Sequence, residues 1–267
     1  MIKRLILVCF VVLFTAPFVS AQLWKMKRYE ASAGLGTSQF YGDIGGFSLG
    51  ENAIGFRDIT FRQTRFNVNG SFRYFITDNI AGRLSLSYIM LHATDVRGSN
   101  EFRNYEAVTS LFEPLLVGEY YFVRNRERNS FLFQTYRGRS RNRLKDFFRS
   151  IDLYAMTGIG GAAFSVNGNE ILEQRWSINP EQKSKGFTAV IPAGLGAKLT
   201  IDPNILIGVE LNGRYTFSDF LDGYDPDVPP NPDPDREFSR RKDVYHTFSV
   251  TFNYRIKTAR NGLPSFR

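Results

Sequence analysis

The fold class is decided by residues 66–74, which read FNVNGSFRY. Apolar or small side chains occupy every second position from Phe66 to Tyr74, and polar side chains occupy the positions between them. A period of two is typical of a β-strand whose two faces meet different surroundings. The same alternation runs through residues 205–217, which read ILIGVELNGRYTF. Because helical periodicity is weak elsewhere in the chain, the sequence predicts an all-β protein.

Eight segments carry this alternation, and each holds about ten residues or more, the length that a tilted strand needs to cross a bilayer. Four are clear and four are weaker: residues 66–74, 80–90, 205–217 and 246–256, then 29–41, 112–122, 151–165 and 187–201. The register of 151–165 stays open, because no polar face opposes Leu153 and Ile159 there. An even number of long strands predicts an eight-stranded antiparallel outer-membrane β-barrel.

The composition narrows the class further. Hydrophobic residues make up 43% of the chain and the mean hydropathy is −0.25, which excludes a polytopic helical membrane protein. Aromatic residues make up 15%, far too many for a disordered chain. A secreted β-sandwich or a lipocalin-like barrel would also alternate, but its strands are usually shorter and its apolar face is the buried one. Here the polar face carries opposite charges that suit an enclosed lumen, so the membrane barrel is favoured.

The N-terminal segment predicts export. Residues 1–21 combine two basic residues near the start, an apolar run and small residues at the end, the pattern of a cleaved secretory signal peptide. An N-terminal anchor helix is the alternative. Cleavage would also remove Cys9, the single cysteine, and with it any disulfide or thiol ligand. The predicted mature protein is then a barrel over residues 22–257 in the cell outer membrane, followed by a periplasmic tail over 258–267.

The connections between strands predict which end of the barrel faces which compartment. With the N-terminus in the periplasm, the turns at 76–79 and 202–204 are periplasmic and tight. The outward connections are long and polar, at about 42–64, 92–104, 166–185 and 218–243. Short periplasmic turns with long outer loops are the usual asymmetry of such barrels. The exception is the long periplasmic connection over residues 124–150.

That connection is strongly basic, and we name residues 124–150 the basic connection. It holds nine basic and two acidic residues, whereas the rest of the exported chain is close to neutral. The basic residues are Arg124, Arg126, Arg128, Arg137, Arg139, Arg141, Arg143, Lys145 and Arg149. We interpret them as a docking surface for an acidic periplasmic protein. A solvated loop that touches anionic headgroups of outer-membrane lipids is the alternative. Nucleic acid is not expected as a partner in this compartment.

The inward positions of the predicted strands carry charges of both signs. These residues are Glu30, Arg73, Arg83, Glu113, Glu119, Lys198, Glu210, Arg214 and Arg255. The interior of an eight-stranded barrel is narrow and side chains fill it, so we expect an ion-pair network that plugs the lumen. A transport pore is the alternative, but eight strands leave too little room for one.

Two further patterns suggest a ligand site and are better explained otherwise. Residues 158–163 fit the glycine pattern of a dinucleotide site, but a strand end and a turn follow where a helix is required. Small residues in a crowded barrel wall explain the match. The carboxylates of residues 222–235 suggest an outer-loop Ca²⁺ site, but their spacing is not that of an EF-hand and the prolines favour a rigid solvated loop. We predict no cofactor and no metal site.

The two histidines suggest a rim enzyme. His92 lies near Asp95 in the sequence, and His246 is expected opposite Ser218 and Asp219, so an acid or a nucleophile is available to each. No fixed spacing supports either arrangement, and His246 falls on the lipid-facing register. We therefore predict no catalytic residue and a protein that is not an enzyme.

Three short motifs resemble one family. Residues 41–44 (YGDI), 214–222 (RYTFSDFLD) and 262–264 (GLP) are similar to the corresponding places in PorG-like outer-membrane proteins of the type IX secretion system. The resemblance covers most of the exported chain in layout. It implies a small barrel that contacts the periplasmic ring of the secretion machine, which is built from a lipoprotein and its partner protein. One departure is that eleven residues follow the expected strand end at Ile256, a candidate for a second periplasmic contact.

We therefore expect a structural protein that anchors or couples a periplasmic secretion assembly to the outer membrane. Three alternatives stay open. The first is a passive small outer-membrane barrel of the adhesin or envelope-stability type. The second is a rim enzyme that acts on lipid or peptide, and the third is a soluble lipocalin-like carrier.

Overall fold

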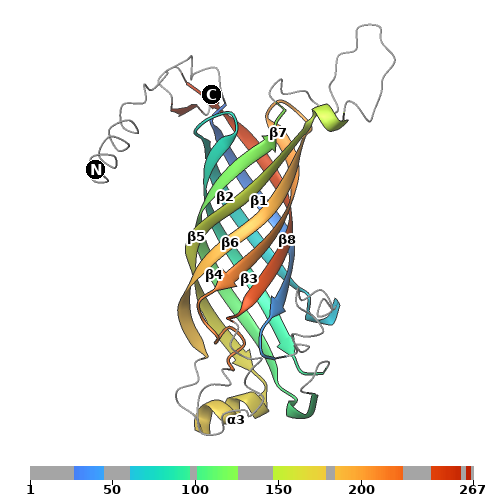
Figure 1. Ribbon diagram of the computed structural model, residues 1–267, viewed down its shortest axis with the longest axis vertical. Helices are drawn as coiled ribbons and strands as arrows, with labels where there is room; N and C mark the ends of the chain where they lie inside the picture. Colours follow the sequence, from blue (N-terminus) through green and yellow to red (C-terminus); the bar gives the residue numbers. More distant parts are fainter. Residues whose placement is uncertain are drawn as a thin grey trace, which may run out of the picture.

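Eight long antiparallel strands wind into a closed barrel in the computed structural model (Figure 1). The structure describes residues 27–44, 61–96, 101–125, 147–178, 184–224, 242–259 and 263–265. The strands are β1 (Tyr29–Tyr41), β2 (Arg65–Phe75), β3 (Ile80–Thr94), β4 (Glu106–Val123), β5 (Ile151–Gly168), β6 (Lys185–Thr200), β7 (Ile205–Thr216) and β8 (Val244–Thr258). Each strand pairs with the next along the chain, and β1 pairs with β8 to close the barrel. The predicted eight-stranded antiparallel barrel is confirmed.

The outer surface of the barrel is apolar and the lumen is polar. Leu84, Leu116 and Ile159 point outward and are 55%, 62% and 67% exposed, while their sequence neighbours point inward and are mostly buried. A soluble barrel has the opposite arrangement, because water surrounds it. This apolar belt is what a barrel needs when hydrocarbon surrounds it.

Three strands extend further than the sequence pattern predicts. β3 continues to Thr94, β4 begins at Glu106 rather than at residue 112, and β5 continues to Gly168. At these strand ends most inward side chains are apolar, for example Leu111 and Val166, which belong to the buried core. In these strand ends both faces carry apolar side chains. The alternation of polar and apolar residues is therefore lost, and the sequence does not show that the strand continues.

The glycine-rich segment at residues 158–163 lies in the middle of β5. A Cβ atom on Gly158 would stand 2.1 Å from the carbonyl oxygen of Leu116, and one on Gly160 would stand 2.3 Å from that of Pro114. These glycines let β5 approach β4 closely. The strand continues to Gly168, so no helix follows at the place where a dinucleotide site requires one.

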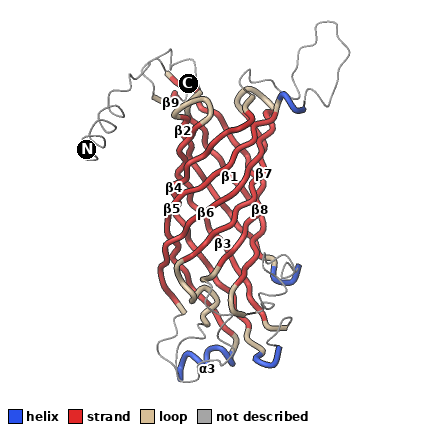
Figure 2. Tube along the Cα trace, viewed as in Figure 1, coloured by secondary structure: helices blue, strands red, loops and turns tan. Residues whose placement is uncertain are grey.

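The two ends of the barrel differ (Figure 2). We name the end that carries the start of β1 the proximal end. It also carries the turns after β2 and β6, and a short strand, β9 (Pro264–Ser265), which pairs with the end of β8. The other end, the distal end, carries the 3₁₀ turns η3 (Phe61–Gln63) and η4 (Glu101–Arg103) and the helix α3 (Glu170–Ile178). The expected orientation places the proximal end in the periplasm.

Helix α3 was not predicted from the sequence. Asn169 caps it, because its side-chain oxygen accepts the backbone N–H of Leu172 at 3.1 Å. Leu172 is its one buried residue, so the segment lacks the repeated apolar positions that identify an amphipathic helix in a sequence.

A charge on the apolar belt should destabilise the barrel according to its depth in the bilayer. We expect Leu116→Arg, near the middle of β4, to lower the free energy of unfolding by about 2–4 kcal/mol. The matched control is Phe122→Arg at the proximal end of the same strand, which should cost about 0–1 kcal/mol. Denaturant titration of the barrel in lipid vesicles measures both. Equal costs at the two positions would contradict a membrane-spanning belt.

Candidate functional site

The proximal half of the lumen is filled by eight charged side chains, which we name the inner network. Each of the eight strands contributes one residue, and none of the eight is more than 6% exposed. In strand order they are Glu30, Arg73, Arg83, Glu119, Asp152, Lys198, Glu210 and Arg255. Four carboxylates face four cations, so the network carries no net charge when all are ionised.

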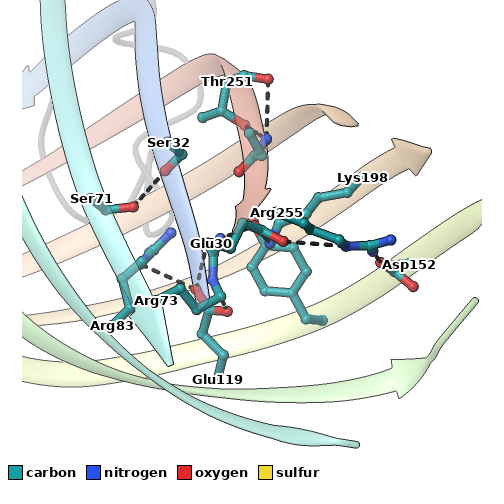
Figure 3. Close-up of polar contacts among 12 residues, drawn as sticks. Glu30, Ser32, Ser71, Arg73, Arg83, Glu119, Asp152, Lys198, Thr251 and Arg255 are labelled. Carbon is teal, nitrogen blue, oxygen red and sulfur yellow. Dashed lines mark hydrogen bonds and ion pairs between the residues drawn. The ribbon is translucent and has the colours of Figure 1, made fainter. Parts of the chain in front are cut away.

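Glu30 lies among three of the cations, as Figure 3 shows. Its carboxylate binds the Arg73 guanidinium, accepts a hydrogen bond from Lys198 Nζ at 2.6 Å, and lies 3.7 Å from Arg255 Nε. The other two nitrogens of Arg73 donate hydrogen bonds to the Glu119 carboxylate, from Nε to Oε2 at 2.6 Å and from Nη2 to Oε1 at 2.9 Å. This bidentate geometry is the strong form of an arginine–carboxylate pair.

The remaining pairs connect the other strands. Arg83 binds Glu210 at 2.6 Å and Glu119 at 3.1 Å. Arg255 binds Asp152 at 2.9 Å. The ion pairs of Arg83 connect β3 to β7 and to β4, and the pair of Arg255 with Asp152 connects β8 to β5. Together with the contacts of Glu30 and the Arg73–Glu119 pair, they link all eight strands in one connected set of ion pairs.

Two buried tyrosines complete the inner network. Tyr121 donates its hydroxyl hydrogen to Glu119 at 2.8 Å and accepts one from Lys198 at 2.9 Å. Tyr154 donates to Glu210, and the two rings stack with centroids 4.9 Å apart. The rings fill the space between the ions, and their hydroxyl groups satisfy polar atoms that water does not reach.

A second, smaller group lies further toward the distal end. Arg214 binds Glu113 at 2.8 Å and also donates to the hydroxyl of Thr247, while Tyr245 donates its hydroxyl hydrogen to Glu113. Between the two groups is a cavity of about 10 Å³, room for a single water molecule. The described part of the lumen is therefore a packed interior and not a channel.

The structure places all nine predicted lumen residues inside the barrel. Sequence reasoning missed Asp152, Tyr121, Tyr154 and Tyr245. Asp152 falls on the inward register of β5 together with Tyr154 and Met156. A fixed register for residues 151–165 would have identified it.

The distal mouth is closed by residues 218–224, which we name the distal cap. The carboxylate of Asp222 accepts the backbone N–H groups of Asp43 at 2.9 Å and Ile44 at 3.0 Å. Asp243 accepts the N–H of Leu221 at 2.8 Å, and the Leu221 side chain is fully buried. The YGDI and RYTFSDFLD motifs, far apart in the sequence, therefore form one structural unit.

Helix α3 and the turn η4 support the cap from outside. Trp176 Nε1 donates to the carbonyl oxygen of Gly223 at 2.7 Å, and Gly223 has a φ of 75°, a conformation that favours glycine. The rings of Tyr105 and Tyr224 contact each other with centroids 5.4 Å apart, and the Arg103 guanidinium lies 5.5 Å and 5.1 Å from these centroids. The cap thus contacts three other connections at the distal end of the barrel.

Asp219 and Asp222 of the cap are buried close to Asp243, which directly precedes β8. Burial raises the pKa of Asp222 to about 7. Burial and the nearby carboxylates of Asp222 and Asp43 raise the pKa of Asp243 well above its usual range. Lys242 forms an ion pair with Asp219 at 3.3 Å, but this lysine is partly exposed. Unlike the inner network, the described part of the cap brings several buried carboxylates close together.

The proximal mouth holds both described ends of the basic connection. The Arg124 guanidinium lies over the rings of Phe75 and Tyr121, 4.0 Å and 4.7 Å from their centroids. Arg149 is exposed in a helical turn beside Phe147 and Phe148. The other predicted contact residues lie outside the described residues: Arg126, Arg128, Arg137, Arg139, Arg141, Arg143 and Lys145.

The histidines do not form the rim arrangements considered from the sequence. His92 Nε2 lies 2.8 Å from Glu106, whereas Asp95 binds Arg103 at 3.2 Å. His246 points outward against the ring of Tyr41, and Asp219 binds Lys242 instead.

The structure also bears on metal ions and spanning helices. Among the residues that the structure describes, no group of three or more His, Cys, Asp or Glu side chains is arranged to hold a metal ion. Residues 225–235 of the acidic loop lie outside them. No helix within the described ranges is long and apolar enough to cross a membrane.

The chain is similar to one protein family and to several solved structures. No curated protein matches the chain. The family described as "Domain of unknown function (DUF6089)" matches residues 142–254. Similar solved structures include Neisserial surface protein A, with 9% identity over 86% of this chain and 97% of that chain and a TM-score of 0.42. The N-terminal β-barrel domain of Pseudomonas aeruginosa OprF has 14% identity over 85% and 98%, with a TM-score of 0.39.

Escherichia coli outer membrane protein W is a third such structure, with 15% identity over 85% of this chain and 97% of that chain and a TM-score of 0.39. At these identities the likeness concerns the fold alone. The closed barrel, the apolar belt and the filled polar lumen define the class of this protein, a small outer-membrane β-barrel.

Breaking the inner network from one side should be costly. We expect Arg73→Met to lower the free energy of unfolding by about 3–5 kcal/mol, because it leaves Glu119 buried without its bidentate partner and removes one of the three cations around Glu30. Arg62→Met, on the exposed turn η3, is the control and should change it by less than about 0.5 kcal/mol. Denaturant titration in vesicles measures both free energies. A small effect of Arg73→Met would show that the ion pairs of Arg73 do not stabilise the barrel.

The distal cap should loosen as the pH rises. A pKa of about 7 for Asp222 in the closed cap, against its ordinary value of 3.8, means that the closed form binds the proton more tightly than an open form. The cap is therefore most stable below about pH 4, and its closing equilibrium should fall by up to about tenfold per pH unit between about pH 4 and 7.

Amide hydrogen exchange at Asp43 and Ile44, corrected for the intrinsic rate, measures this equilibrium. Asp243→Asn keeps an acceptor for the Leu221 N–H but removes one buried negative charge, so it should raise protection at pH 8 and flatten the pH profile. Asp78→Asn, in an exposed proximal turn, is the matched control. A profile that Asp243→Asn leaves unchanged would show that the cap carboxylates do not control closure.

Proposed function

We propose that this protein is the outer-membrane barrel component of a type IX-like protein secretion machine. In this role it is a structural component without catalytic activity, and it anchors or couples a periplasmic ring to the outer membrane. The single observation that carries the proposal is the filled lumen, closed by the inner network and by the distal cap. A barrel with a packed interior acts through its surfaces and not through a passage.

The basic connection is the surface that we assign to the ring. Its charge is concentrated in one segment, and charge of one sign favours association with a partner of the other sign. Arg124 and Arg149, its described basic residues, lie at the proximal mouth, which faces the periplasm in the expected orientation. We propose as partner an acidic face of the ring lipoprotein or of its partner protein. Export through a cleaved signal peptide over residues 1–21 belongs to the same proposal.

A passive barrel that works through its outer loops is the second candidate. The observation that favours it is the distal end, where Phe102 and Ile178 are exposed apolar side chains at 81% and 74%. Such side chains on outer connections suit contact with another surface. This candidate predicts that changes in the basic connection leave protein secretion intact, which separates it from the proposal above.

The proposal is tested by purification from native envelopes in mild detergent, with mass spectrometry of the bound proteins. The test variant combines Arg137→Glu, Arg139→Glu and Arg141→Glu. The control variant carries the same change in charge at the distal end, through Arg62→Glu, Arg65→Glu and Lys185→Glu. We expect the test variant to recover ring proteins at least about tenfold less well than the wild type and the control variant to recover them fully.

Each other outcome decides against part of the proposal. Ring proteins held equally by all three proteins would remove the basic connection as the contact but keep the secretion role. A wild-type barrel that purifies without ring proteins would contradict the secretion role and favour the passive barrel.

A further inference from the structure

The basic connection begins inside the proximal mouth of the barrel, and Asp152 holds its first residues there. The backbone N–H of Asn125 donates to Asp152 Oδ1 at 2.6 Å, and the Asn125 side-chain amide donates to Thr200 Oγ1 at 3.2 Å. Asn125 and Asp152 are both buried. A hydrogen bond to a buried carboxylate is stronger than one between neutral groups, so this end of the connection is fixed to the wall.

The same carboxylate also belongs to the inner network. Its other oxygen, Oδ2, accepts a hydrogen bond from Arg255 Nη2 at 2.9 Å, and Arg255 lies 3.7 Å from Glu30 (Figure 3). Asp152 is therefore shared between the backbone of Asn125 and the cations of the lumen. Within the described residues, its hydrogen bond with Asn125 connects the inner network to the basic connection.

Two further contacts fix the ends of the connection to the same place. Arg124 lies over Tyr121, whose hydroxyl group bonds both Glu119 and Lys198. At the other end, the buried Ser150 accepts the backbone N–H of Thr200 at 2.9 Å. Thr200 thus meets Asn125 through its side chain and Ser150 through its backbone, so both ends of the connection converge on one point of β6.

We propose that Asp152 is a positioning residue that locks the described ends of the basic connection, residues 124–125 and 147–150, to the inner network. The lock itself follows from the contacts above and does not depend on the partner. Its consequence for capture of the ring rests on the proposed function. Arg255 acts on the connection through Asp152, because it holds the carboxylate in the position that Asn125 requires.

The lock is measured by amide hydrogen exchange of the full barrel in detergent micelles, read at Asn125 and at Thr200. Asp152→Ala should speed exchange at Asn125 by at least about tenfold, because the charged acceptor is lost. Amides near Arg214, in the other half of the lumen, should keep their wild-type rates. Glu113→Gln, which alters a buried carboxylate that pairs with Arg214, is the matched control and should leave Asn125 unchanged.

Arg255→Met is the decisive second variant, because it leaves Asp152 in place and breaks its pair with the inner network. Coupling predicts faster exchange at Asn125 in this variant as well, and less than additive effects when Asp152→Ala and Arg255→Met are combined. Retained heat-modifiable migration in gel electrophoresis shows that each variant has folded. If the Asn125 amide exchanges at the wild-type rate in every variant that folds, the proposed lock is wrong. If neither variant folds, Asp152→Asn, which removes the charge with the least change in shape, replaces them under the same criterion.

Capture of ring proteins by the same variants separates the lock from the proposed function. Faster exchange at Asn125 together with reduced capture supports both. Faster exchange with wild-type capture keeps the lock and overturns its link to the partner. A wild-type barrel that captures no ring proteins contradicts the proposed function, while the exchange rates still decide whether the lock exists.

Discussion

A charge inside an eight-stranded barrel has to be paired, and most of this structure follows from that constraint. The interior is too narrow for bulk water, and an ion left alone there costs several kcal/mol. The protein meets the constraint by giving each strand one charged residue in the proximal half of the lumen, four of each sign. Tyr121 and Tyr154 fill the remaining space and bond the carboxylates. The contacts that neutralise the lumen are thus the contacts that close it.

The same constraint explains what could be predicted from the sequence. Hydrocarbon outside and a charged interior impose opposite preferences on alternate residues, so the strands and the inward positions of Arg73, Glu119 and Glu210 are visible in the period of two. Which acid meets which base is not visible, because Arg73 reaches Glu119 across two strand boundaries. Asp152 was missed because no polar face marks the register of β5. Helix α3 has a single buried residue and therefore no periodicity to read.

The distal cap could not be predicted for a different reason. Its bonds join Asp43 and Ile44 to Asp222, across 179 and 178 residues, and no local pattern reports contacts of that separation. Among the described residues, Asp219, Asp222 and Asp243 are buried near one another, and burial together with the neighbouring carboxylates raises the pKa of Asp243. The closed cap therefore binds a proton more tightly than an open form does, which links closure of the distal mouth to pH. The two ends of the lumen are therefore closed by different chemistry, fixed ion pairs at one end and a titratable cluster at the other.

A barrel cross-linked in this way is suited to bear a load. In a hollow barrel, a pull on one strand is resisted by the hydrogen bonds to its two neighbours, whereas here Glu30, Arg73 and Arg83 connect strands that are not adjacent. Force applied at the proximal mouth would reach β5 through Asp152 and pass from there to β8 and β1 through Arg255 and Glu30. In a transport channel, the same cross-links between strands would block the passage. On the proposed role, the filled lumen is therefore what lets so small a barrel hold a large periplasmic assembly.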